Sequence, residues 1–433
     1  MSKRDIICRK IIEWGIFGLI VLSPLPKASV HEWSILVIQL VVFIMMIAYL
    51  LMQDKPVMEI QLKESLRWPR YLFTGLFVLI FVQILPWPKF LLNLISPKSV
   101  NFREMYAAGF TNVKFMGLSL IPSHTLQAGL ELLAYVLLGF LVVKTVTQRK
   151  QILRIVYAVI GMGIFQAFYG LFELYNKNPR LLFYKKIHYL SDVTGTFVNR
   201  NHLSGYLEMV IPLTIGLILV RSDIFATVGL SLRRKVLSLA EKNNYRTLLM
   251  ALGVILMAVA VVFSRSRSGI FLLMLTFVLL FGMGTVYTGS RQQYQKGMKR
   301  FVQVVFLMIV VLCLFVGIDS TLERFALDNI LNEVRPLVWG NTAAIIGDYS
   351  IFGSGLGTFS AVYPAYEENV MSAQVLHAHN DYLEYFAELG VVGGLLLLAG
   401  ILFMLIISFL VWKEKRNPEV KGLALGGIIA VVN

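Results

Sequence analysis

The sequence has few charged residues for its length. Only 15% of its 433 residues are Asp, Glu, Lys or Arg, whereas roughly a quarter are charged in a typical soluble domain. Hydrophobic residues make up 57%. The shortage of charge excludes an ordinary soluble domain. The apolar residues occur in runs of about 20, and runs of this length predict membrane-spanning helices.

Cysteine is also scarce, with only Cys8 and Cys313. We expect the first in an inner segment and the second within a membrane helix, so they cannot pair, and neither has metal ligands nearby. A disulfide scaffold and a cysteine-based metal site are therefore excluded. The basic start MSKRDIICRK lacks a convincing cleavage site, so the first apolar stretch is expected to remain as a helix.

Apolar runs long enough to cross a bilayer recur along the whole chain. A backbone in lipid must satisfy its own hydrogen bonds, so we predict an all-α, polytopic transmembrane helical bundle. An eleventh run begins at Gly422 and stops at Asn433. We expect the chain to be truncated there, within a bundle of about 11–12 spans. The ten preceding spans are 12–26, 33–52, 71–92, 126–143, 152–175, 203–220, 247–263, 269–288, 301–318 and 389–412.

Basic residues are distributed unevenly between the connecting segments. With a cytoplasmic N-terminus, the inner segments carry 26 of the 40 lysines and arginines. Positive residues concentrate in cytoplasmic loops, so this bias predicts that orientation. It also explains the net charge of +15 by a basic face near anionic lipid, with no need for nucleic acid. The inner segments are 1–10, 53–70, 144–154, 221–246, 289–300 and 413–421.

Histidine, which titrates near neutral pH, is predicted on one side of the membrane only. All six histidines lie outside in this topology. The outer side also carries a large loop, 319–388, which we expect to form short helices. We divide the chain into N-terminal membrane helices with their outer loops, 1–187, and a second domain, 188–433. The histidines are His31, His124, His188, His202, His377 and His379.

The segment TGTFVNRNHLSGYLEM, 194–209, brings polar side chains to the start of an apolar helix. Asn199 and His202 could cap free backbone N–H groups there. Alternatively, Arg200 and the positive end of the helix could hold an anion. Both interpretations stay open.

The segment SRSRSG places Arg265 and Arg267 in a very short turn between apolar spans. An arginine at the centre of a membrane helix costs about 2.5–3.5 kcal/mol, so two near the rim need a reason. One is snorkelling to lipid phosphate. The other is a pair of guanidinium groups for phosphate or pyrophosphate, which they bind bidentately. An extended turn would point both side chains the same way, whereas a helical turn would separate them.

The large outer loop contributes Arg335, which could form a local salt bridge with Asp328, Glu333 or Asp348, or reach a site. The same loop contains GSGLG, 353–357. This run follows no strand and opens no βαβ unit, so we reject a nucleotide-binding loop. We expect its glycines to permit a tight turn with positive φ.

The segment HAHNDYLEYFAELG, 377–390, concentrates polar side chains directly before an apolar span. A zinc site needs three or four ligands, and the carboxylates here have no recognised spacing, so we predict no metal. A histidine here could cap the helix or form a salt bridge. The remaining interpretation is a general base that acts on a hydroxyl beside phosphate-binding arginines.

Together, GTFVNRNHLSGYL, SRSRSG and RPLVW…GSGLGTF…HAHNDYLEYFAELGVVG resemble, in order, characteristic stretches of the O-antigen ligase and polysaccharide polymerase superfamily. These are bacterial inner-membrane glycosyltransferases that use polyprenyl-diphosphate-linked sugars. The family pattern of His, then Asn, Ser or Gln, then nine residues and Gly is met by His379, Asn380 and Gly390. The resemblance covers residues 190–412.

The resemblance implies a glycosyltransferase C-like fold and an O-antigen ligase-like second domain. It assigns His379 as the catalytic histidine, Arg267 or Arg265 as a diphosphate ligand, and Arg335 as the arginine of the large periplasmic loop. We add Arg200 as a further diphosphate ligand. Asn199, His202, His377 and Asn380 are expected to support the site.

The implied reaction is a single, metal-independent displacement without a cofactor. A glycan on undecaprenyl diphosphate, held at the arginines, passes to an acceptor hydroxyl from which His379 takes a proton. The implied partners are this lipid-linked donor, membrane lipid and a lipid A core acceptor. The site would face the periplasm from the bacterial inner membrane.

The acceptor stays open. A polymerase would extend a growing polysaccharide, and a protein O-oligosaccharyltransferase would modify a protein. From another class, we consider a transporter of bicarbonate or of a lipid-linked intermediate. Coupled transporters place ionisable groups near the bilayer midplane and show paired repeats, which weighs against transport here.

Overall fold

A computed structural model describes residues 2–56, 67–106, 113–176, 178–221, 244–287, 335–367, 374–414 and 418–432, with a few positions between 303 and 311. This part of the chain is almost entirely helical and contains two short two-stranded antiparallel sheets. Its composition and helices confirm the predicted all-α polytopic membrane fold. The predicted span 301–318 lies almost wholly outside the described residues. Five described helices are long and apolar enough to cross a bilayer: Glu32–Leu51, Pro122–Thr145, Arg149–Leu174, Tyr245–Phe263 and Asp381–Glu414.

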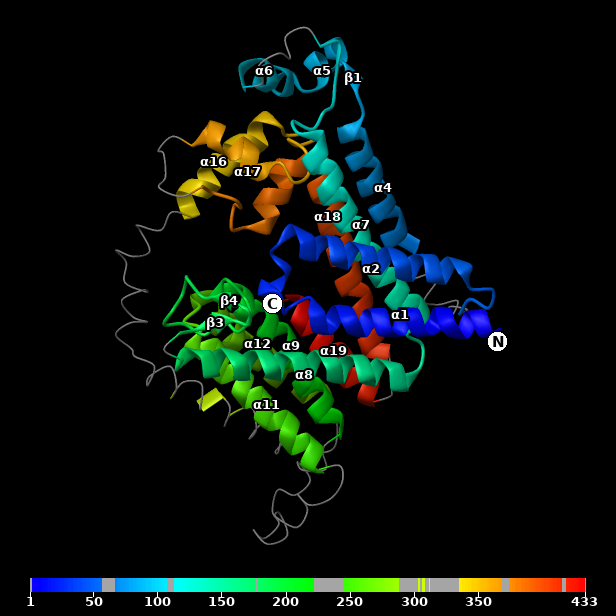
Figure 1. Cartoon of the computed structure of the whole chain (residues 1–433), viewed down its shortest axis with the longest axis vertical. Helices are drawn as coiled ribbons and strands as arrows, with labels where there is room; N and C mark the ends of the chain where they lie inside the picture. The colour runs from blue at the N-terminus through cyan, green and yellow to red at the C-terminus, as the bar shows by residue number, and fades with distance from the viewer. Residues whose placement is uncertain are drawn as a thin grey trace. The chain divides into compact units, whose positions relative to one another are not determined.

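The chain forms two compact units, each assembled from separated stretches (Figure 1). Unit 1 comprises Met1–Lys55, Leu141–Phe325 and Ile407–Asn433, and unit 2 comprises Pro56–Phe140 and Ala326–Ile406. The predicted division at residue 188 separates the chain by function and not by packing, and it stays a prediction.

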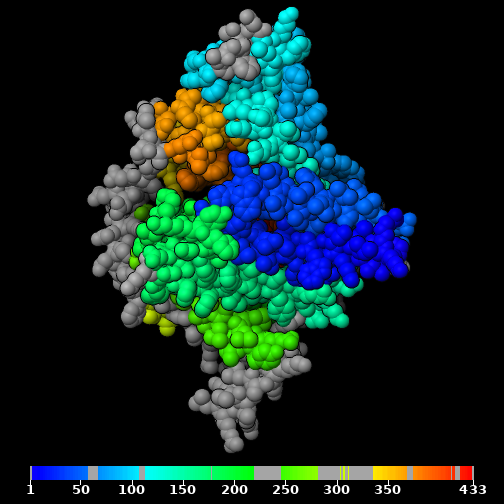
Figure 2. Space-filling view, in the orientation of Figure 1, coloured from blue at the N-terminus to red at the C-terminus, as the bar shows by residue number. Residues whose placement is uncertain are grey.

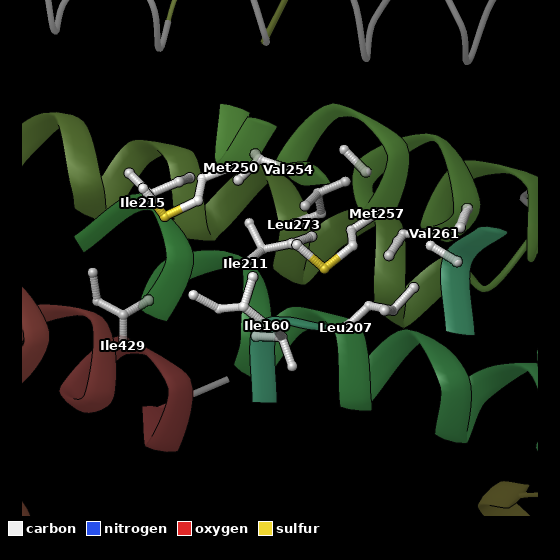
Figure 3. Packing of buried hydrophobic residues seen from close by; sticks show 14 of the residues in the cluster. Ile160, Leu207, Ile211, Ile215, Met250, Val254, Met257, Val261, Leu273 and Ile429 are labelled. Carbon is white, nitrogen blue, oxygen red and sulfur yellow. The ribbon is translucent and has the colours of Figure 1, made fainter. Parts of the chain in front are cut away.

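Unit 1 is a helical bundle whose core comes from α8, α9, α11, α12 and α19. Ile160, Leu207, Met257 and Leu273 of the first four helices point toward one another in this core (Figure 3). Gly216 of α9 packs so closely on α19 that a Cβ would lie 2.2 Å from the carbonyl oxygen of Gly422, as small residues allow in membrane bundles. The elements of unit 1 are α1 (Lys3–Leu22), η1 (Lys27–Ser29), α2 (Glu32–Leu51), α8 (Arg149–Leu174), β3 (Arg180–Leu181), β4 (Tyr184–Lys185), α9 (Arg200–Arg221), α11 (Asn244–Phe263), α12 (Arg267–Tyr287) and α19 (Pro418–Val432).

The segments of unit 1 that were predicted to face outward meet at one end of the bundle. The Thr196 hydroxyl donates to the carbonyl of Pro24, and the N–H of Val193 donates to the carbonyl of Phe263 at 3.1 Å. The Oγ atoms of Ser204 and Ser264 lie 2.8 Å apart. The connection between α8 and α9, coloured green, lies at the surface in Figure 2. Neighbouring helices of this part of the bundle therefore run in opposite directions: α8 and α9, and α11 and α12.

Unit 2 contains the remaining elements, and one of its predicted spans was wrong. The span 71–92 was predicted as one helix, but α4 ends at Ile84 and a short strand and a separate helix follow. Pro86 and Pro88 have no N–H to donate, which ends the helical hydrogen bonding there. The elements are α4 (Arg67–Ile84), β1 (Trp87–Pro88), α5 (Lys89–Ile95), α6 (Pro97–Tyr106), β2 (Phe115–Met116), α7 (Pro122–Thr145), α16 (Arg335–Asp348), α17 (Phe359–Val362), η3 (Tyr363–Tyr366) and α18 (Asp381–Glu414), with α7 and α18 continuing into unit 1.

The glycine-rich run GSGLG forms a tight turn against the start of α18. Gly353, Gly355 and Gly357 have φ values of +74°, +115° and +75°, which confirms the expected positive φ. The carboxylate of Glu388 accepts hydrogen bonds from the N–H groups of Gly357, at 2.8 Å, and Phe359, at 2.9 Å. The turn thus has a structural partner inside unit 2.

Gly390 interrupts α18 with φ +66° and ψ −175°. A Cβ at this position would lie 2.3 Å from the carbonyl oxygen of Ile351. Asn380 begins the helical segment that Gly390 ends, because its side chain accepts a hydrogen bond from the N–H of Leu383 at 3.3 Å. The His-Asn-nine-Gly pattern therefore encodes a capped helical segment followed by a break.

We expect Gly390→Ala to destabilise the protein by about 2 kcal/mol or more, because it combines left-handed strain with a backbone clash. The measurement is thermal unfolding of the purified protein in detergent. Gly400→Ala, also in α18, is the matched control, since a Cβ there meets nothing within 4 Å. It should be neutral or stabilising by about 0.5–1 kcal/mol. Equal changes in thermal stability for the two variants would refute this account of Gly390.

Candidate functional site

Two of the arginines predicted to bind phosphate meet at one buried carboxylate in unit 1. Arg200 Nη1 lies 2.6 Å from Asp192 Oδ2, and Arg265 Nη1 lies 3.6 Å from Asp192 Oδ1. The Asp192 side chain is 3% exposed, whereas those of Arg200 and Arg265 are 19% and 29% exposed. Two guanidinium groups therefore share one negative charge and remain partly accessible.

A lysine and a tyrosine complete this cluster. Lys186 Nζ donates to the carbonyl of Asp192 at 2.7 Å, and burial lowers the pKa of its ammonium group. The guanidinium of Arg200 lies over the ring of Tyr189, 5.0 Å from its centroid. Even when only the two arginines are counted, one positive charge is not balanced by Asp192. The cluster can therefore attract an anion.

The SRSRSG turn buries its serines and partly exposes its arginines. Ser264 and Ser266 are 0% and 1% exposed, and Arg265 and Arg267 are partly exposed. The Oγ of Ser266 accepts a hydrogen bond from the N–H of Gly269 at 3.2 Å, which caps α12. Arg265 has a φ of +53°, so the turn is neither extended nor helical throughout. Arg267 becomes the first residue of α12, at the positive end of that helix.

At the start of α9, Asn199 supports the helix and His202 faces solvent. The side chain of Asn199 accepts a hydrogen bond from the N–H of Asn201 at 2.9 Å, and its carbonyl accepts one from the N–H of His202 at 3.2 Å. His202 is exposed. The cap and the anion interpretations are thus compatible, because Asn199 caps the helix while Arg200 belongs to the cation cluster.

In unit 2, the HAHN segment is fixed from two sides. His377 Nδ1 lies 2.8 Å from Glu384 Oε1, and Glu384 Oε2 accepts a hydrogen bond from the N–H of Ala378 at 2.8 Å. The hydrogen bond to Glu384 raises the pKa of His377 above its ordinary value. Trp339 of α16 donates its indole N–H to the carbonyl of Ala378 at 3.0 Å. The residue between the two histidines is therefore anchored to both α16 and α18.

His379 directly follows Ala378 in the chain, and Arg335 lies on the same helix as Trp339. His379 is exposed and has a φ of +54°, a conformation that few non-glycine residues adopt. Arg335 begins α16, four residues before Trp339 and about 6 Å from it along the helix axis. Asp348 lies at the other end of α16 and binds Lys98 and Tyr366. It is therefore not the local partner considered for Arg335, and the other two candidates, Asp328 and Glu333, lie outside the described residues.

The structure thus brings the predicted site residues together in two groups, one in each unit. Their convergence on one site stays a prediction. In the described part of the chain, no group of three His, Cys, Asp or Glu side chains is placed to hold a metal ion. The group in unit 1 is Asn199, Arg200, His202, Arg265 and Arg267, and the group in unit 2 is Arg335, His377, His379 and Asn380.

Sequence reasoning missed Asp192 and Lys186. It allowed for a salt-bridged histidine in the HAHN segment, and the structure shows this pairing for His377 with Glu384. One signal was present for Asp192, because it is the only acidic residue between Glu173 and Glu208 in a basic segment. A single acidic residue in such a basic segment indicates that several basic side chains pair with it.

We expect Asp192→Asn to destabilise the protein by about 3 kcal/mol, since removing one member of a buried ion pair leaves its partners uncompensated. Thermal unfolding in detergent measures this. Glu13→Gln is the matched control, because Glu13 and Arg154 form a pair of the same 2.6 Å length at an exposed position. It should cost less than about 1 kcal/mol. A comparable loss in both variants would show that Asp192 does not hold the cluster together.

Comparison with known families supports the resemblance seen in the motifs. Residues 252–398 match a family model described as O-antigen ligase, which confirms the predicted superfamily. The matched range contains Arg265, Arg267, Arg335 and the HAHN segment. No curated protein matches the chain.

Proposed function

From the O-antigen ligase domain that residues 252–398 carry, we propose that this membrane glycosyltransferase moves a glycan from undecaprenyl diphosphate to lipid A core. The observation that carries the proposal is the cation cluster around Asp192. Arg200 and Arg265 share one carboxylate and stay partly exposed. A diphosphate supplies the missing negative charge, and its oxygens match the fork of a guanidinium group.

Arg267 is the principal diphosphate ligand in this proposal. Arg267 is the first residue of α12, where helix N–H groups and the dipole favour an anion. Arg200 and Arg265 set the positive field around it. The resemblance adds Arg335 to the proposed ligands.

The reaction follows from these roles. The bond between the anomeric carbon of the donor sugar and the phosphate oxygen breaks, and a bond forms between that carbon and the acceptor oxygen. His379 takes the acceptor proton, and the arginines stabilise the charge that develops on the leaving diphosphate. The glycan is already activated by its carrier, so the proposed mechanism uses no metal and no nucleotide. Asn380 and His377 hold the segment that presents His379.

We place this chemistry on the periplasmic face of the bacterial inner membrane. The predicted outer segments of unit 1 gather at one end, which includes the loops of His31 and His188 and the start of α9. In unit 2, the HAHN segment likewise stands at the start of α18. A single cysteine introduced at His188 should therefore be labelled by an impermeant reagent from the periplasm. Labelling only after the membrane is opened would show that the orientation is opposite to the proposed one.

Reconstitution of the full chain in proteoliposomes tests the function. The donor is an undecaprenyl-diphosphate glycan, and the acceptor is lipid A core, more donor, or an exported protein. Glycosylated lipid A core supports the ligase, a longer lipid-linked glycan indicates a polymerase, and a modified protein indicates an O-oligosaccharyltransferase. Movement of donor or bicarbonate across the bilayer without transfer would contradict the proposal.

A further inference from the structure

Unit 2 contains a cavity of about 340 Å³ beside the HAHN segment. This volume falls in the range of roughly 300–1,000 Å³ that is usual for small-ligand sites. Three stretches line the cavity: α7, the glycine-rich turn with the residues after it, and the first two turns of α18 with the segment that leads into them. The polar and aromatic side chains of this lining include Glu131, Tyr135, His377, Glu384, Tyr385 and Glu388.

The wall of the cavity is fixed before any ligand binds. Glu388 is held by the N–H groups of Gly357 and Phe359, and Glu384 by His377 and Ala378. Tyr135 donates its hydroxyl to Glu131 at 2.5 Å. A wall whose side chains already have partners loses little freedom on binding, which favours a specific ligand.

The charge of the wall distinguishes this cavity from the cation cluster of unit 1. Four carboxyl side chains line it, those of Glu131, Asp381, Glu384 and Glu388, and no Lys or Arg does among the residues that the structure describes. Carboxylates repel a diphosphate and an acidic sugar. They accept hydrogen bonds from hydroxyl groups, and charged acceptors make stronger ones than neutral acceptors.

Two aromatic rings add an apolar surface. Tyr135 and Tyr385 line the cavity and are 53% and 38% exposed. A sugar ring has an apolar face of C–H groups and an edge of hydroxyls, so tyrosine rings beside fixed carboxylates suit both sides of it. His377 also lines the cavity, and it lies two residues before His379 along the chain. Their Cα atoms are at most about 7 Å apart.

We propose that this cavity is the acceptor-sugar subsite and that it binds a neutral sugar ring in preference to one carrying carboxylate or phosphate. The inference rests on the proposed transfer reaction and adds the location and chemical class of its acceptor. In it, Tyr385 and Tyr135 contact the ring, and Glu131 and Glu384 accept hydrogen bonds from its hydroxyls. The reacting hydroxyl then points toward the segment that carries His379.

The first test uses two tyrosines of the same helix. Tyr385 lines the cavity, whereas Tyr382, three residues earlier in α18 and 60% exposed, does not. In the transfer assay we expect Tyr385→Ala to raise the KM for the acceptor about tenfold, with the KM for the donor unchanged, as for loss of an aromatic binding residue. Tyr382→Ala should leave both constants unchanged. Equal acceptor KM values for the two variants would overturn the proposal.

The second test measures binding without transfer. Neutral hexose trisaccharides, and the same trisaccharides with the terminal hydroxymethyl group oxidised to a carboxylate, are bound to the full chain in nanodiscs with no donor present. Saturation-transfer NMR should favour the neutral set by about tenfold or more, since like charges are disfavoured. Glu131→Gln should reduce this preference and should weaken binding of the neutral set.

The two tests separate failure of the subsite from failure of the proposed reaction. Transfer by the wild type with no preference for neutral trisaccharides overturns the subsite and leaves the reaction standing. Binding of neutral trisaccharides that Tyr385→Ala abolishes, in a protein that transfers nothing, supports the subsite and overturns the reaction. If no neutral trisaccharide binds, the cavity is not a sugar site.

Discussion

Replacing His379 by alanine is expected to lower the rate of glycan transfer by about 10²–10⁴-fold, the usual contribution of a positioned general base. The acceptor hydroxyl would have to lose its proton to water in the variant. Initial rates in proteoliposomes, normalised to the amount of folded protein, measure the effect. His379→Gln retains a polar side chain of similar reach, and it should be as slow as alanine because an amide cannot take the proton.

His188→Ala serves as the matched control, because His188 is an exposed histidine in a predicted outer loop of unit 1 and is not one of the proposed site residues. Its transfer rate should equal that of the wild type. If His379→Ala retained full activity, the assignment of His379 as the base would be wrong. If His377→Ala alone abolished transfer, the base would be reassigned to the histidine that is paired with Glu384.

The second large effect is expected at Arg267. Arg267→Ala should lower the transfer rate by about 10²–10³-fold, as loss of one preorganised charge-stabilising donor does in other enzymes. Arg267→Lys should recover only a small part of this rate, because an ammonium group cannot make two parallel hydrogen bonds to a diphosphate. The same proteoliposome assay, with the concentration of donor varied, separates binding of the donor from the chemical step.

Arg180→Ala is the control for charge, since Arg180 is an exposed arginine in β3 of the same unit. It should change neither the rate nor the KM for the donor. An Arg267→Lys variant with wild-type activity would mean that positive charge is sufficient and that no bidentate contact is made.

Much of the helical architecture follows from the sequence because lipid leaves an apolar chain few alternatives. Nine of the eleven predicted spans correspond to described helices, although their ends shift by several residues. Hydropathy failed after Ile84 because Trp87 and Phe90 are apolar while the prolines between and beside them stop the helix. The two non-contiguous units were also not foreseen, since hydropathy says nothing about which helices pack together.

The candidate site was predictable only where residues are close in sequence. Gly390 follows Asn380 by ten residues, and both act on one helical segment, so the motif contained their structural role. The partnership of Asp192 with Arg265 joins residues 73 positions apart, and periodicity does not reveal such a pair. Trp339 of α16 likewise anchors Ala378, which precedes α18 and lies 39 residues further along the chain. These pairings come from tertiary packing.

The amide of Gln83 in α4 donates to the carbonyl of Phe352 at 2.6 Å and to that of Glu388 at 2.9 Å. During synthesis, the helix that contains Gln83 is made 305 residues before Glu388. At about 5–20 residues per second, this buried polar group must wait roughly 15–60 s for its second partner. The N-terminal part of unit 2 is therefore synthesised well before the part that completes it. We expect the nascent helices in 67–145 to depend on a membrane chaperone until residue 388 has been made.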